Sequence, residues 1–143
     1  MTPQNYKNHA RLVPLYHFVL SAALLVLFVA GIVRSIMAIG TPELMIDLQY
    51  TGLVAANLII YLFVRSFPLK AQDRAIRAEE NFRHYLLTGK TLNPELKVPQ
   101  IVALRFAPDE EFVALAERAV KENMQQDEIK KAIKNWKADT YRV

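Results

Sequence analysis

Three consecutive acidic residues, Asp109, Glu110 and Glu111, form the densest group of carboxylates in this 143-residue chain. Carboxylates that bind a metal or share acid–base work must converge on one centre. Pro108 stands just before them, and a proline followed by acidic residues is typical of the start of a helix. Consecutive side chains point in different directions on a helix, so the triplet does not predict a catalytic or metal site.

The three histidines, His9, His17 and His84, lie in different segments and lack the i, i+3 or i+4 spacing of helical metal ligands. The chain has no cysteine, which excludes disulfides, thiolate zinc sites and cysteine nucleophiles. It also lacks a glycine-rich phosphate loop and a Ser–His–Asp arrangement with supporting context. We therefore expect no catalytic residue, no cofactor and no metal, and a protein that is not an enzyme.

Two uncharged apolar runs, Leu12–Val33 and Leu48–Val64, dominate the first half of the chain. A bilayer core of roughly 30 Å is crossed by about 20 helical residues, and about 17–25 are tolerated. The first run is too long for the apolar part of a signal peptide, which spans about 7–15 residues. The second is apolar on every face, and a chain of this size has no core to bury it. Both runs are predicted to span a membrane.

Basic residues flank the two runs on one side, and the positive-inside rule therefore gives an orientation. Lys7 and Arg11 precede the first run. After the second run come four basic residues, namely Arg65, Lys70, Arg74 and Arg77. The connecting loop balances Arg34 against Glu43 and Asp47. We expect both termini in the cytoplasm and the short loop outside.

Small and polar residues within the runs predict helix–helix contacts, because lipid offers a polar side chain no hydrogen bond. These candidate packing residues are Gly31, Ser35, Gly52, Ala56 and Asn57. One interpretation is that they pack the two spans against each other. Another is that Asn57, near the middle of the second run, contacts a different subunit. A third is that Asn57 lines a transport path.

The polar part of the chain predicts a small helical bundle. From Leu69 to Leu87 an apolar stripe recurs at helical spacing, through Ala71, Ala75, Ala78, Phe82, Tyr85 and Leu86. We expect this stripe to pack against the helices that follow, the alternative being that this helix lies on anionic lipid. Gly89 predicts the end of the helix. The segment 99–106 has both strand and helix features, and we choose a helix because the tail offers no second strand.

The last predicted helix places four lysines, Lys130, Lys131, Lys134 and Lys137, opposite its apolar residues. Such a face is either simply solvated or a basic patch for anionic headgroups, RNA or an acidic partner. Residues 65–143 carry 15 basic and 12 acidic residues. This mixture argues against nucleic acid as a partner.

Three stretches carry a resemblance to a known family. They are Gln4–His9, Leu104–Ala107 leading into Asp109–Phe112, and Ile129–Trp136. Together they resemble an uncharacterised family of short bacterial two-span membrane proteins, a domain of unknown function. The resemblance covers essentially the whole chain and implies a bacterial inner-membrane location. It implies no catalytic or binding residues.

The sequence thus predicts an all-α integral membrane protein, a two-helix hairpin followed by a small cytoplasmic helical bundle. The function we expect is that of an accessory or interaction subunit whose partners are the lipid bilayer and another protein or further copies of itself. The alternatives are a transporter or channel subunit and a membrane-tethered module for anionic lipid or RNA. The predicted parts are a cytoplasmic segment 1–11, a hairpin 12–66 with spans 12–34 and 47–65 around the loop 35–46, and a cytoplasmic domain 67–143 with helices 68–88, 99–106, 108–123 and 126–137.

Overall fold

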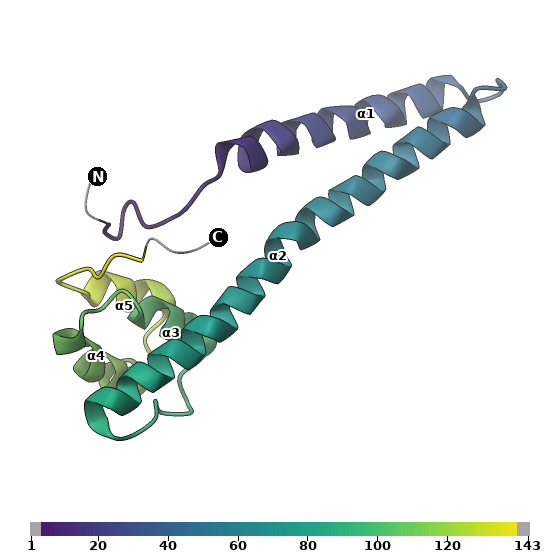
Figure 1. Cartoon of the computed structure of the whole chain (residues 1–143). Helices are drawn as coiled ribbons and strands as arrows, with labels where there is room; N and C mark the ends of the chain where they lie inside the picture. The colour runs from purple at the N-terminus through teal and green to yellow at the C-terminus, as the bar shows by residue number, and fades with distance from the viewer. Residues whose placement is uncertain (1–3, 140–143) are drawn as a thin grey trace. The chain divides into compact units, whose positions relative to one another are not determined.

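The computed structural model describes residues 4–139, which are helical and contain no strand (Figure 1). The predicted all-α class is confirmed for this range. The elements in order are η1 (Leu15–Leu20), α1 (Ser21–Met37), α2 (Leu44–Thr88), α3 (Val98–Leu104), α4 (Asp109–Lys121) and α5 (Gln126–Ala132).

The chain divides into two compact units. We call residues 11–67 the apolar hairpin, and the described residues 4–10 and 68–139 the helical module. The helix α2 contributes its first part to the hairpin and its last part to the module.

The apolar hairpin consists of η1, α1 and the first part of α2, which a short turn connects (Figure 1). The stretch Leu15–Met37 and the helix α2 are both long and apolar enough to cross a membrane. At the turn, Arg34 forms an ion pair with Asp47 at 3.0 Å. At the other end, the Tyr16 hydroxyl donates to the carbonyl oxygen of Tyr61, and the two rings stack with centroids 4.5 Å apart.

The helix α2 is longer than the sequence predicted. The segments 47–65 and 68–88 are predicted as separate helices, yet one helix of 45 residues runs through Pro68 at their junction. A proline inside a helix removes one backbone hydrogen bond and crowds the preceding turn, which long helices tolerate when their other bonds are intact. The helix ends at Thr88, and Gly89 follows with a φ of +72° and donates its N–H to Tyr85 at 2.8 Å. A glycine accepts this left-handed conformation without steric cost.

The core of the helical module lies between α3, α4 and α5. Its largest fully buried side chains are Leu104, Phe106, Phe112 and Ile129. Gln100 fixes the start of α3, because its Oε1 accepts the N–H of Lys97 at 2.7 Å and its Nε2 donates to the Met124 carbonyl at 2.8 Å.

The N-terminal segment belongs to the same core. The ring of His9 lies 5.9 Å from the ring of Phe106 and 5.7 Å from that of Trp136. The amide Oε1 of Gln4 accepts the backbone N–H of Asp139 at 2.8 Å. The two ends of the described chain therefore pack side by side in the module.

The helix α5 is shorter than predicted and ends at Ala132 rather than near residue 137. Ile133 already has an extended backbone, with ψ of 123°. Beyond it, Trp136 packs on Phe106 with ring centroids 4.8 Å apart, and Lys137 donates its N–H to the Phe106 carbonyl at 2.8 Å. Packing of the partly buried Trp136 ring on the core thus outweighs one further helical turn. The helix α3 likewise ends at Leu104, two residues before its predicted end.

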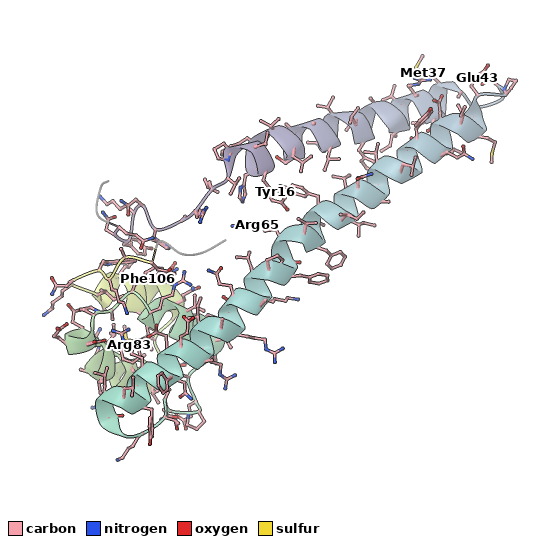
Figure 2. The ribbon with its side chains drawn as sticks, in the orientation of Figure 1. Tyr16, Met37, Glu43, Arg65, Arg83 and Phe106 are labelled. Atoms are coloured by element: carbon pink, nitrogen blue, oxygen red, sulfur yellow. The ribbon has the colours of Figure 1, made fainter. Side chains whose placement is uncertain are left out.

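Arg83 joins α2 to the rest of the module (Figure 2). Its guanidinium pairs with Glu80 at 2.9 Å and Asp109 at 2.6 Å, and it donates to the Ala107 carbonyl at 2.8 Å. The same group lies 4.3 Å from the centre of the Phe112 ring. Only 13% of the Arg83 side chain and 9% of the Glu80 side chain are exposed. Charges buried to this degree are stable only when they are fully paired.

Replacing Arg83 by methionine should therefore destabilise the full-length protein by about 2–4 kcal/mol, because Glu80 is left buried without its counter-charge. The matched control is Arg118→Met, which removes an exposed i, i+4 pair with Glu122 and should cost under about 0.5 kcal/mol. Unfolding in detergent can be followed by the fluorescence of Trp136, the single tryptophan of the chain. Equal losses in the two variants would contradict the assigned role of Arg83.

Candidate functional site

The acidic triplet at the start of α4 has structural contacts. Asp109 binds Arg83, as described above. The carboxylate of Glu111 accepts the backbone N–H groups of Lys134 and Asn135, each at 2.9 Å. The backbone N–H of Lys134 is the main cause that lowers the pKa of Glu111 below its ordinary value. The stabilisation from Glu111 is therefore present at neutral pH and is lost as the pH falls through that lowered pKa.

The histidines lie in separate local turns. The Nδ1 of His84 donates to the Lys90 carbonyl at 2.7 Å, and that of His9 to the Tyr6 carbonyl at 2.6 Å. The Nδ1 of His17 lies 3.0 Å from the Val13 carbonyl. Within residues 4–139, no three or more His, Asp or Glu residues are grouped so that they could hold a metal ion.

Two of the predicted packing residues lie at the contact between α1 and α2. The hydroxyl of Ser35 is 3.1 Å from that of Thr51, and Ser35 is buried. A methyl group built on Gly31 would lie 2.7 Å from Thr51 Oγ1, so any larger residue would have to displace the Thr51 hydroxyl. Thr51 was missed because a threonine near the end of a span gives no distinctive sequence signal. Its Oγ1 also donates to the Asp47 carbonyl at 2.8 Å, which holds the hydroxyl in place.

The other three predicted packing residues do not face α1. Gly52, Ala56 and Asn57 are exposed, and open space surrounds a methyl group built on Gly52. The Nδ2 of Asn57 donates to the carbonyl of Leu53 in its own helix at 2.9 Å. The reason is register: α2 meets α1 through the side that carries Asp47, Thr51 and Tyr61. Asn57 is thus placed on an outward face of the hairpin.

The four lysines of the predicted basic face do not share a helix face. Lys130 is buried and lies 4.0 Å from Asp127. Lys131 is exposed at the end of α5, with its ammonium 5.4 Å from the centre of the Tyr6 ring. Lys134 and Lys137 follow in the extended segment. The early end of α5 therefore disperses the patch that the sequence predicted.

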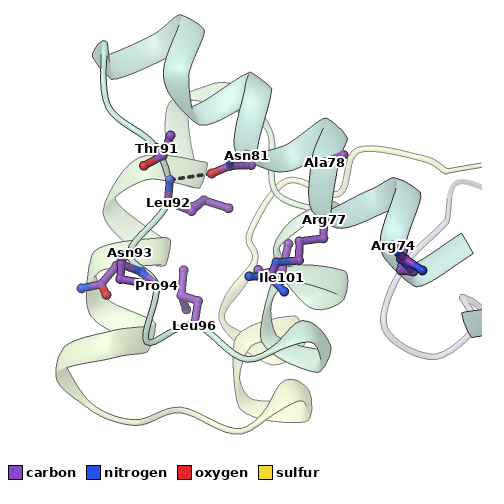
Figure 3. A pocket seen from close by; sticks show the side chains of 10 residues that line it. All are labelled: Arg74, Arg77, Ala78, Asn81, Thr91, Leu92, Asn93, Pro94, Leu96 and Ile101. Atoms are coloured by element: carbon purple, nitrogen blue, oxygen red, sulfur yellow. Dashed lines mark hydrogen bonds between the residues drawn. The ribbon is translucent and has the colours of Figure 1, made fainter. Parts of the chain in front are cut away.

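A cavity of about 410 Å³ lies between α2 and residues 91–101 of the module (Figure 3). Leu92, Leu96 and Ile101 supply its apolar surface. Arg74 and Arg77 also line it, and guanidinium groups of this kind attract anions. Asn81 fixes the position of Leu92 in the cavity wall, because its amide oxygen accepts the N–H of Leu92 at 2.9 Å. The cavity combines positive charge with apolar surface but brings no nucleophile or acid–base pair together.

The apolar stripe of α2 is exposed, which corrects the expectation that it packs in the bundle. Its members Ala71, Ala75, Ala78, Phe82, Tyr85 and Leu86 are all exposed. The module packs instead on Ile76, Glu80 and His84, which are buried. Apolar spacing failed here because the inner face of this helix is largely polar. These polar groups have partners: Arg83 binds Asp109 and the Ala107 carbonyl across the contact, and His84 donates to the Lys90 carbonyl.

The comparisons with known proteins give one family. The model of a family of unknown function (DUF6526) matches residues 1–143, and the chain belongs to that family. No curated protein and no solved structure matches the chain.

A pair of glycine substitutions tests the contact between α1 and α2. Gly31→Ala and Gly52→Ala gain the same helix propensity, but only the first creates a clash, with Thr51. We expect Gly31→Ala to be less stable than Gly52→Ala by about 1–3 kcal/mol, the range for overpacking a tight contact. Resistance of the full-length protein to unfolding in mixed detergent micelles measures the difference. Identical stabilities would show that the helices do not meet at Gly31.

Proposed function

We propose that this chain is a two-span protein of the bacterial cytoplasmic membrane that has no enzymatic activity and holds a partner protein. In this proposal the apolar hairpin lies in the bilayer and the helical module lies in the cytoplasm. The observation that carries the proposal is the outward apolar surface of the hairpin.

The large apolar residues of the hairpin point outward. Leu25, Val26, Leu53, Ile60 and Leu62 are each more than half exposed. A water-soluble protein rarely exposes a continuous apolar surface of this extent, because each exposed side chain costs about 1.5–3 kcal/mol relative to burial. The few polar contacts between the helices of the hairpin, such as Ser35 with Thr51, pair groups with each other. Such pairing suits a segment that hydrocarbon surrounds.

The charge pattern supports the proposed orientation. The turn between α1 and α2 carries Glu43, and Arg34 and Asp47 pair at the two helix ends beside it, a combination that crosses a membrane easily. After the second apolar run, α2 carries four basic residues within a stretch of thirteen residues, namely Arg65, Lys70, Arg74 and Arg77. Basic residues this close to the end of a span favour retention in the cytoplasm.

Asn57 supports the role in holding a partner. It is exposed in the middle of the second apolar run and does not face α1. An amide exposed in hydrocarbon gains an interhelical hydrogen bond when it meets a second protein, worth about 0.6–2 kcal/mol. We therefore assign to Asn57 the contact with a transmembrane helix of the partner.

Labelling of single cysteines tests the membrane position, since the natural chain has none. Glu43→Cys in the loop should react with a membrane-impermeant maleimide in intact cells. Lys90→Cys, an exposed position of the module, should react only after the cells are permeabilised. Both variants should stay in the membrane pellet after alkaline washing. A washed-out protein, or labelling of Lys90→Cys in intact cells, would overturn the proposed position.

Capture of the tagged full-length protein from native membranes in mild detergent tests the partner role. We expect a second protein to be recovered with it, and Asn57→Leu to lower that recovery about threefold to tenfold, since it removes one interhelical hydrogen bond. The matched control is Ala30→Leu, which adds the same side chain at an exposed position of α1 and should leave recovery unchanged. Recovery of the chain alone from every membrane preparation would contradict the role.

A further inference from the structure

The exposed apolar stripe of α2 has the spacing of a coiled-coil seam. Ala71, Ala75, Ala78, Phe82 and Tyr85 follow one another in alternating steps of four and three residues. This is the a/d pattern by which two helices pack knobs into holes. All five side chains are exposed, including 62% of Phe82 and 53% of Tyr85. We call these five residues the seam.

The helical module packs mainly on the opposite side of α2 and leaves the seam accessible; of the seam residues, Ala78 also lines the cavity between α2 and residues 91–101. Ile76, Glu80 and His84, which the module buries, take the b, f and c positions when Ala75 is a. These positions lie opposite the a/d line on a helical wheel. The polar network of Arg83 with Glu80 and Asp109 fixes this rotation of α2 relative to the module. The module thus fixes the orientation of the helix face that carries the seam.

The charges beside the seam are complementary to those of a second, parallel copy. Arg74 is at a g position and Glu79 at the e position five residues later. In a parallel pair of helices, a g residue meets the e residue of the following heptad on the partner helix. Arg74 would therefore face Glu79 of the other copy, twice by symmetry. No charged residue takes an a or d position between residues 71 and 85.

We propose that two copies of this chain pair in parallel through the seam and form a homodimer. The inference rests on the proposed membrane position, because two copies inserted the same way into one bilayer present this helix in the same direction. Confinement to one membrane also raises the effective concentration of the second copy, so a short seam suffices. An anionic lipid surface fits the seam less well, since Arg74 on one flank is opposed by Glu79 on the other.

Disulfide cross-linking in native membranes tests the pairing. Single cysteines replace Ala71, Ala75 and Ala78 on the seam, and replace Lys70 and Arg77 on the exposed c positions as matched controls. After mild copper-catalysed oxidation, we expect roughly tenfold more covalent dimer at the seam positions, because only there do the two helices come within disulfide distance. Equal yields at seam and control positions, or no dimer at any seam position, would overturn the proposal.

Exchange of the flanking charges tests the parallel register. In the Ala75→Cys background, Arg74→Glu should lower the dimer yield about threefold to tenfold, since it places two acidic residues opposite each other. The double variant Arg74→Glu with Glu79→Arg should restore the yield, and unaltered Trp136 fluorescence verifies that the module is intact. A double variant as weak as the single one would overturn the parallel register.

The outcomes for this proposal and for the proposed function are separate. A protein that stays in washed membranes with the predicted labelling, but gives no seam cross-link, removes the homodimer only. A protein released by the alkaline wash removes the proposed membrane position and, with it, the basis of the parallel dimer. Cross-linking at the seam without any second protein on capture removes the partner role and leaves the homodimer in place.

Discussion

The continuity of α2 is the constraint on which both units depend, because this one helix contributes residues to each. Its 45 residues have a length of about 68 Å, more than twice the thickness of a bilayer core. A helix satisfies its backbone groups internally and can therefore pass from hydrocarbon into water without new partners. Pro68 leaves one carbonyl without its donor, and it does so between the apolar and the charged part of the helix, where water would supply that donor in the proposed membrane position. The helix α2 is thus continuous although it contains a proline.

Polar contacts, more than apolar ones, determine how the module attaches to α2. An Arg–carboxylate cluster adds little to stability by itself, since desolvation offsets most of the attraction. It does restrict geometry, because Arg83 has to meet Glu80, Asp109 and the Ala107 carbonyl at once. A rotation of α2 by one position would leave these groups buried and unpaired, at a cost of several kcal/mol. The cluster therefore selects one rotation of the helix, while the core around Phe112 and Ile129 supplies most of the stability.

Prediction from the sequence succeeded where a single strong signal acted. The apolar runs, the acidic start of α4 and the stop at Gly89 each have a local cause, and the structure has the corresponding helices. It failed where distant residues decide. The polar inner face of α2 can be buried because Asp109 and the Ala107 carbonyl bind Arg83. The helix α5 ends early because Trp136 packs on Phe106. The role of Thr51 in the hairpin likewise depends on its contact with Ser35, which the sequence alone does not indicate. Apolar periodicity contains no information about these long-range contacts.

The seam is weak by composition, and this weakness fits the proposed membrane position. Three of its five members are alanines, which bury little apolar area, so Phe82 and Tyr85 have to supply most of the contact. Two such helices would not pair stably in dilute solution, because a short coiled coil gains too little to offset the entropy of association. Two copies held in one membrane, as proposed, would already have lost most of that entropy. Pairing then depends on how many copies share the bilayer, so the amount of protein in the membrane would control the amount of dimer.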